Sequence, residues 1–168
     1  FTAEPGKTTA FIGSTGCGKS TLVNLIPRFY DVTDGKITID GKDIRNVSQH
    51  ELREKLGYVP QKAVLFSGDI ASNILYGNPD GSEADMTEAA MIAQATEFIE
   101  QKKKKYKSTI SQGGSNVSGG QKQRLSIARA IAKHPDVYIF DDSFSALDYK
   151  TDATLRAKLK EKTSESTV

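Results

Sequence analysis

The feature that most constrains this chain is a glycine-rich segment of eight residues, Gly13 to Ser20, which reads GSTGCGKS. It has the form G-x-x-x-x-G-K-[ST] and follows Thr8–Ile12, which predicts a short buried strand. It leads into residues with helical character. Glycines let such a backbone curl until its N–H groups converge, and the following helix adds its positive end. The pattern of strand, loop and helix therefore predicts a site for the phosphates of a nucleotide on an α/β fold.

Most residues of this loop are expected to contact ATP or its Mg²⁺. The Lys19 ammonium group is expected to reach the β- and γ-phosphates, and the Ser20 hydroxyl is expected to bind Mg²⁺. Cys17 is interpreted as a small residue at a tolerant position, and the alternative is a thiol whose modification would block nucleotide. The other expected nucleotide contacts in this segment are Ser14, Thr15, Gly16, Cys17 itself, Gly18 and Thr21.

A second apolar run, Val137–Phe140, ends in two adjacent carboxylates. Four consecutive apolar residues are typical of a central parallel strand. A phosphate loop needs a carboxylate at the end of a neighbouring strand to support Mg²⁺, and Asp141 is predicted to be that residue. Asp142 is predicted to be the general base for the attacking water.

The rest of the chain reads as an α/β parallel-sheet core with two insertions. Residues 36–39 alternate between turn dipeptides and predict a strand in a small antiparallel sheet. Residues 56–61 predict another strand, residues 69–106 predict helix, and Ser118 with Gln121 fits a capping box at a helix start. A last amphipathic helix is expected over residues 153–162.

Composition excludes some classes of partner. The 168 residues carry 23 basic and 21 acidic side chains, and the net charge of +2 predicts no nucleic-acid partner. The one charge run, Lys102–Lys107, is interpreted as a solvated face, and the alternative is binding to an anionic headgroup or RNA. With a single cysteine the chain forms no internal disulfide, as fits a reducing compartment.

Three further segments resemble motifs of the ATP-binding cassette (ABC) ATPases. Residues 116–121 (NVSGGQ) look like the family's signature segment, Gln61 resembles its Q-loop glutamine, and residues 145–148 (SALD) resemble its D-loop. They lie in family order and cover essentially the whole chain. The resemblance implies a P-loop NTPase (RecA-like) core at about 1–68 and 119–168, with a helical subdomain at about 69–118.

The resemblance also implies a mechanism, in which two such domains close head to tail over two ATP molecules. The residues implied to contact the partner's ATP are Ser118, Gly119, Gly120, Gln121 and Asp148. Gln61 would contact nucleotide and share Mg²⁺ with Ser20 and Asp141. Gln61, Lys19 and Asp142 would carry catalysis.

Within the family, the chain resembles the exporters of the multidrug type. Residues 65–74 (LFSGDIASNI) are similar to the exporter segment after the Q-loop, and residues 28–31 (RFYD) match a further exporter stretch. The stretch from Lys19 to Ser118 is too short for the coiled coil of chromosome-maintenance ATPases. Implied partners are a second ABC ATPase domain and transmembrane domains of an exporter, at the cytoplasmic face of the membrane. Phe66 would then lie near the surface that meets those domains, and the alternative is ordinary core packing.

One departure from the family pattern is Asp142, where most members carry glutamate. Since aspartate reaches about 1.5 Å less far, it predicts a weak base. We therefore expect the degenerate-site half of a heterodimer. The alternatives are a homodimer that uses Asp142, a regulatory ATP-binding module with little turnover, and a soluble ABC protein without transport. The family's adenine-stacking aromatic residue and switch histidine are expected outside the chain, so truncation at both ends and weak intrinsic activity are expected.

Overall fold

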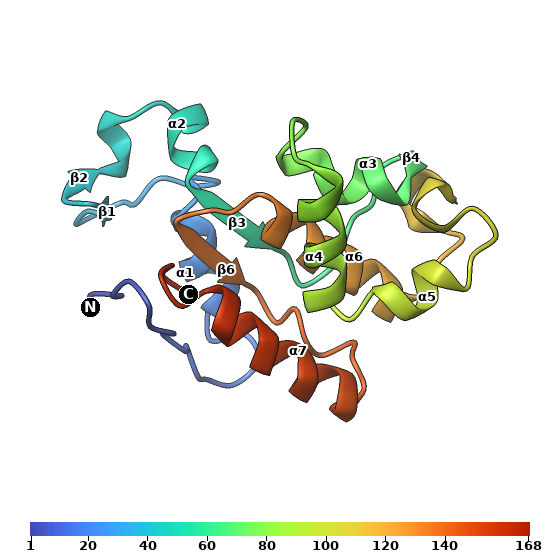
Figure 1. Ribbon diagram of the computed structural model, residues 1–168. Coiled ribbons are helices and arrows are strands. Elements are labelled where there is room, and N and C mark those ends of the chain that lie inside the picture. Colours follow the sequence, from blue (N-terminus) through green and yellow to red (C-terminus); the bar gives the residue numbers. More distant parts are fainter.

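The computed structural model describes all residues from 1 to 168 (Figure 1). Its α-helices are α1 Lys19–Leu25, α2 Gln49–Glu54, α3 Ile70–Ile74, α4 Glu83–Ile92, α5 Thr96–Glu100, α6 Gly119–Ala132 and α7 Tyr149–Lys162. Its strands are β1 Thr38–Ile39, β2 Lys42–Asp43, β3 Leu56–Val59, β4 Gly68–Asp69, β5 Thr109–Ile110 and β6 Val137–Phe140. Four three-residue 3₁₀ turns lie at Ile44–Asn46, Leu75–Gly77, Lys105–Lys107 and Gln112–Gly114.

Strands β3 and β6 form the parallel pair at the centre of the molecule (Figure 1), as their apolar sequences predict. The register runs from Leu56 opposite Val137 to Val59 opposite Phe140. Gly57 sits where no side chain fits, because an added Cβ would lie 2.6 Å from the Pro135 ring. This close approach favours one register of the two strands.

The prediction of a buried strand at Thr8–Ile12 is wrong in this structure. Thr9 N donates to Val168 O and Val168 N donates to Lys7 O, but no backbone hydrogen bond joins residues 10–12 to a neighbouring segment. Ile12 is 96% exposed. Apolar character alone does not make a strand, since the ladder also requires a partner backbone along its length.

The predicted antiparallel insert is present but short. Thr38 pairs with Asp43 and Ile39 pairs with Lys42, so only half of the expected strand at 36–39 is in the ladder. The turn between β1 and β2 places Asp40 and Gly41 at positive φ, the backbone that a tight hairpin with right-handed twist prefers.

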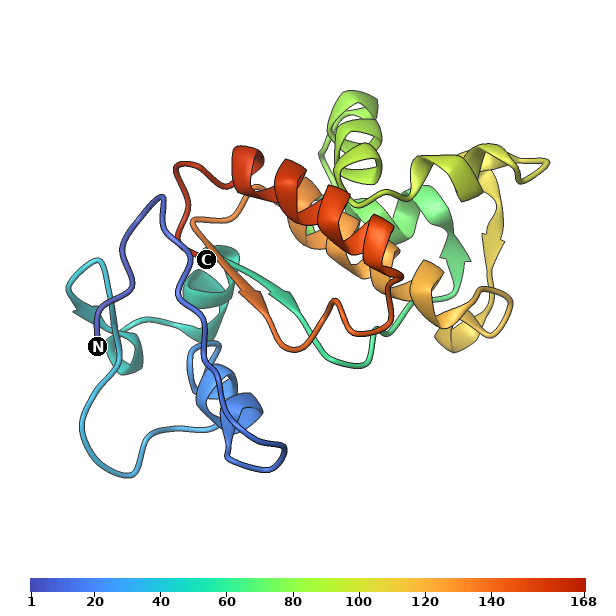
Figure 2. The ribbon, with the colours of Figure 1, turned by 90° about the horizontal axis from the view of Figure 1, so that it is seen from below.

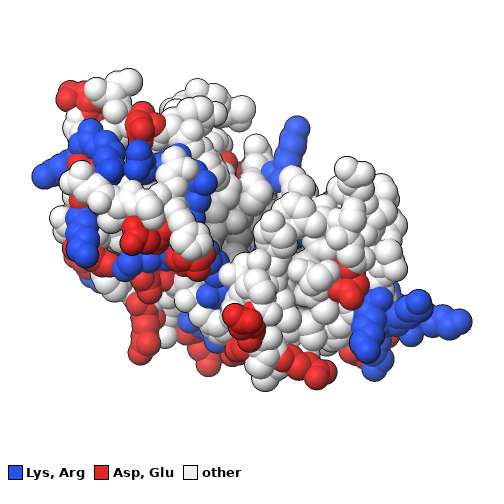
Figure 3. Space-filling model, turned by 90° about the horizontal axis from the view of Figure 1, so that it is seen from above, with Lys and Arg blue, Asp and Glu red and all other residues white.

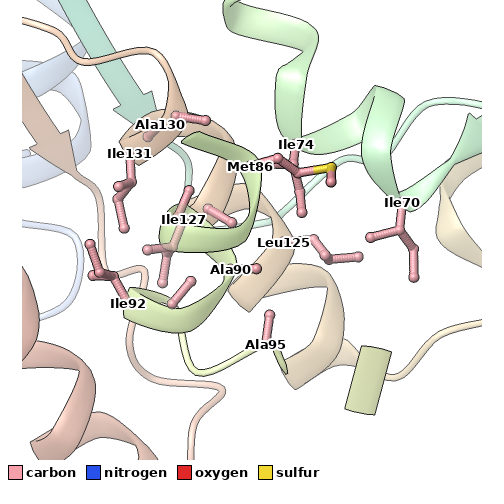
Figure 4. Packing of buried hydrophobic residues seen from close by; sticks show 14 of the residues in the cluster. Ile70, Ile74, Met86, Ala90, Ile92, Ala95, Leu125, Ile127, Ala130 and Ile131 are labelled. Carbon is pink, nitrogen blue, oxygen red and sulfur yellow. The ribbon is translucent and has the colours of Figure 1, made fainter. Parts of the chain in front are cut away.

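The predicted helical region at 69–106 holds α3, α4 and α5, which pack with α6 (Figures 1 and 2). Figure 4 shows the apolar side chains that these helices bury against one another, among them Ile74, Met86 and Leu125. The short antiparallel pair β4–β5, which the pattern did not predict, closes the far end of this region.

Local capping sets the start of both long helices. Ser118 caps α6 in the predicted box, since its Oγ accepts from Gln121 N while Gln121 Oε1 accepts from Ser118 N. Helix α7 starts at Tyr149 rather than at the expected Ala153, because Asp148 accepts from Thr151 N and acts as N-cap. No helix in the structure combines the length and the apolar character needed to cross a membrane.

Candidate functional site

A cavity of about 1170 Å³ opens between the glycine-rich loop, the end of β6 and helix α7. Predicted site residues on its wall are Thr15, Gly16, Gly18, Lys19, Ser20, Thr21, Gln61, Asp141 and Asp142. Ser14 and Cys17 belong to the same exposed loop without lining the cavity. The fold therefore gathers residues that lie more than 100 positions apart in the sequence into one place.

Two glycines of the loop adopt a backbone that other residues rarely reach. Gly16 has φ 83° and Gly18 has φ 91°, and a Cβ added at either would meet nothing within 4 Å. The space beside both glycines is therefore open. Lys19 Nζ donates to Gly13 O at 2.7 Å and to Ser14 O at 2.9 Å, so its ammonium group lies over the same loop.

Ser20 and Asp141, which both line the cavity, are joined by a hydrogen bond. Ser20 Oγ, in the first turn of α1, donates to Asp141 Oδ1 at the end of β6 at 3.0 Å. A hydroxyl and a carboxylate are the oxygen ligands that a hard cation such as Mg²⁺ prefers. This pair is the direct link between the glycine-rich loop and the carboxylate strand.

Gln61 and Asp142 form the second polar contact at the cavity. Gln61 Nε2 donates to Asp142 Oδ2 at 3.0 Å. Each residue lies two positions beyond the last pair of the β3–β6 ladder, Val59 with Phe140, so the strand register sets their separation. Asp142 has φ 47°, a left-handed backbone that aspartate tolerates better than most residues.

The predicted signature residues do not belong to this cavity. The N-terminus of α6 lies apart from α1 in both ribbon views, and residues 118–121 are not on the cavity wall. Gly120 approaches the segment after β6 closely, because an added Cβ would lie 3.2 Å from Ala146 O. Asp148 is held as a cap, and hydrogen bonds from Thr151 lower the pKa of its carboxyl group.

Sequence reasoning did not identify α7 as a wall of the cavity. Asp152, Arg156 and Lys160 from this helix line it, and Arg156 is held by an ion pair to Asp152 at 2.7 Å. The amphipathic pattern indicated a helix, but which neighbour its polar face meets depends on tertiary packing.

The lysine run at 102–107 is mainly exposed. Among its lysines only Lys102 is half-buried, as is Tyr106 within the run, and Lys105 pairs with Glu100 at 2.6 Å. Figure 3 shows one group of Lys and Arg side chains at the right-hand end of the molecule and others, mixed with Asp and Glu, at the opposite end. Phe66 is 42% exposed, so it is not an ordinary core residue, and its ring stacks on that of Tyr76.

Comparison with known proteins identifies the family to which this chain is similar. A family model described as ABC transporter matches residues 1–145. An uncharacterized ABC transporter ATP-binding protein of Mycobacterium tuberculosis is 48% identical over 171 residues, covering 100% of this chain and 29% of the relative. A beta-(1→2)glucan export ATP-binding/permease protein of Rhodopseudomonas palustris is 45% identical over 161 residues, covering 96% of this chain and 27% of the relative.

Among solved structures, a bacterial Atm1-family ABC exporter with ATP bound matches with a TM-score of 0.95 and 40% identity. The match covers 99% of this chain and 29% of that one. It confirms the predicted fold class, an α/β P-loop NTPase core with a small antiparallel insert and helices. The chain thus spans less than a third of the length of these relatives.

Proposed function

Because this chain belongs to the ABC transporter family, we propose that it binds and hydrolyses ATP to drive an exporter. The observation that carries the proposal is the hydrogen bond from Ser20 in the phosphate loop to Asp141 at the end of β6. It brings together the two parts that a phosphoryl-transfer site requires. The export names of the relatives support the direction of transport.

The loop and its neighbours have the chemistry to hold Mg-ATP. The open space beside Gly16 and Gly18 leaves room for phosphate oxygens, which backbone N–H groups of such a loop would bind. Lys19 would hold the β- and γ-phosphates, and Mg²⁺ would be held by Ser20, Gln61 and Asp141. The ion, when bound, neutralises charge that develops on the phosphates.

Asp142 is proposed as the general base of this site. Its carboxylate lies at the cavity and accepts from Gln61, so it would be available to an attacking water there. Because an aspartate falls short of the reach of a glutamate by about 1.5 Å, the site would bind ATP and hydrolyse it slowly.

We infer a head-to-tail dimer from the separation of the two motif groups. Residues 118–121 and Asp148 do not line this chain's own cavity, which suits an action on a partner's ATP. An intact signature segment beside a weak base favours the degenerate-site half of a heterodimer. In that arrangement the core, at 1–68 and 119–168, would hold the nucleotide. The helical subdomain, at 69–118, would be free to contact other parts of the exporter.

The remaining partners follow from the relatives that combine ATP-binding and permease parts. We propose that transmembrane domains bind this chain at the cytoplasmic face of the membrane. We expect no nucleic-acid partner, because the net charge is only +2.

Two other candidate functions rest on Asp142 as well. A homodimer would use Asp142 as its only base, and a regulatory module would hold ATP with little turnover. Site-by-site single-turnover measurements on the assembled exporter distinguish them. Slow hydrolysis here beside fast hydrolysis at the partner site supports the heterodimer, equal rates support the homodimer, and no hydrolysis here supports the regulatory module. Failure of the purified protein to bind ATP would refute all three.

A further inference from the structure

Helix α6 holds both ends of the segment that carries Gln61. The Gln123 side chain is only 3% exposed, and its Nε2 donates to Pro60 O at 3.2 Å. Two turns further along the helix, Arg129 Nη1 donates to Val64 O at 3.0 Å. One rigid element therefore contacts the backbone just before Gln61 and again three residues after it.

Asn73 of α3 strengthens the second of these anchors. It is 1% exposed, its Oδ1 accepts from Phe66 N, and its Nδ2 donates to Phe66 O, both at 2.9 Å. Arg129 is bonded to this residue twice, from Nε to the backbone oxygen at 2.8 Å and from Nη2 to Oδ1 at 2.9 Å. The guanidinium group thus binds three oxygen atoms, Val64 O, Asn73 O and Asn73 Oδ1, and these bonds hold the C-terminal end of the segment.

Arg129 makes these bonds at an unusual electrostatic cost. Burial lowers its pKa to about 10, and no carboxylate forms an ion pair with it. The group is still charged at neutral pH, and the rings of Phe66 and Tyr76 cover it at 5.0 and 5.7 Å. A half-buried charge without a carboxylate needs other acceptors, and three of the five guanidinium N–H groups find them in Val64 O, Asn73 O and Asn73 Oδ1.

Between the anchors, the segment is open to solvent. Gln61 and Lys62 are both exposed, and the one side-chain hydrogen bond that Gln61 makes is the bond to Asp142. A side chain on an exposed loop keeps a defined position only when the backbone on both sides is held.

We propose that Gln123 and Arg129 are positioning residues that hold Gln61 on the cavity wall beside Asp142. We call the two residues the loop clamp. The inference rests on the proposed function, because it assigns them an effect on the Mg²⁺ that accompanies ATP. Neither residue lines the cavity, so the clamp acts through the backbone of residues 60–64.

The test measures binding of a fluorescent ATP analogue, mant-ATP, to the purified protein, in EDTA and during titration with MgCl₂. Gln123→Leu removes the donor to Pro60 and keeps the apolar volume. Arg129→Lys keeps the charge and loses the fork, and it serves should the first variant fail to fold. Ser126→Ala is the matched control, because Ser126 is equally buried on α6 and its side chain makes no bond to the segment.

We expect Gln123→Leu and Arg129→Lys to raise the half-saturating Mg²⁺ concentration about fivefold, the factor that the loss of one hydrogen bond produces. Affinity in EDTA should stay within about twofold, since the phosphate loop is unchanged. In a Gln61→Ala background the same substitutions should have no further effect on the Mg²⁺ response, because the clamp acts through that residue.

An unchanged Mg²⁺ response in both clamp variants would overturn the proposal. So would an equal loss in the Gln61→Ala background, or a Ser126→Ala response that matches the clamp variants. If the unaltered protein binds no mant-ATP in either buffer, the proposed function fails and the clamp fails with it. That outcome is distinct from the others because it appears without any substitution.

Discussion

Replacing Asp142 by glutamate is expected to accelerate ATP hydrolysis at this chain's own site. The Asp142 carboxylate lies 3.0 Å from Gln61 Nε2 and borders the cavity, so it is already placed to act as a base there. One added methylene lengthens the side chain by about 1.5 Å, which is half of a hydrogen-bond distance. A base acts only within about 2.6–3.2 Å of the proton that it takes, so this increment decides whether the contact forms.

The size of the gain follows from what a positioned base contributes. General-base catalysis is worth about 10²–10⁴ in rate, so recovering its lower limit gives a rise of about 100-fold. The backbone sets an opposing cost, because φ 47° suits aspartate better than glutamate and the exchange costs roughly 1 kcal/mol of folding free energy. For a domain of this size that cost lowers Tm by about 2–4 °C.

The assay is a single turnover of radiolabelled ATP in the assembled exporter, with the partner site silenced at its own base. Asp142→Asn is the control, because it keeps the length of aspartate and cannot accept a proton, and it should hydrolyse no faster than the unaltered protein. Normal ATP binding by Asp142→Glu with an unaltered rate would show that the base does not limit this site.

Three other outcomes are expected. Lys19→Ala should weaken ATP binding roughly 10- to 100-fold through the loss of charge-assisted contacts to phosphate, and an unchanged affinity in mant-ATP titration would contradict the assigned loop. Leu125→Ala should cost about 2–5 kcal/mol in urea unfolding, because Leu125 is fully buried, and a loss below 1 kcal/mol would show that the helical core relaxes around it. Hydrogen bonds from Ser82 and then from His134 hold the pKa of Asp85 below its usual 3.8. Its contribution to stability is therefore present above that value and lost as pH falls through the lower folded pKa, so Asp85→Asn should flatten the acid limb of the stability–pH curve, and an unchanged limb would count against this assignment.

Helix starts and the motif residues were predictable because their determinants are local. The Ser118 box needs only a side chain and a backbone group three residues on, and the structure contains both of its hydrogen bonds. The start of α7 was misplaced by four residues for the same local reason, since the role of Asp148 as a cap was overlooked.

Strand pairing and the contacts between motifs depend on partners that the sequence does not bring near. Residues 10–12 have the composition of a strand and lack its hydrogen bonds. The motif pattern placed Ser20 and Asp141 at one site, but the 3.0 Å contact between them depends on how α1 packs beside β6. The loop clamp was invisible for a further reason, because Gln123 and Arg129 bond to carbonyl oxygens, which every residue carries alike.

Gly57 makes the contact between Gln61 and Asp142 depend on one exact strand register. Strand pairing changes only in whole residues, so a slip of β3 along β6 would move Gln61 past Asp142 in steps of about 3.3 Å, and an odd step would also turn its side chain to the other face. No intermediate setting exists in which the 3.0 Å contact is merely loosened. A glycine that does not line the cavity thus makes the site all-or-none. A larger residue at position 57 would be expected to abolish the contact between Gln61 and Asp142 rather than to weaken it.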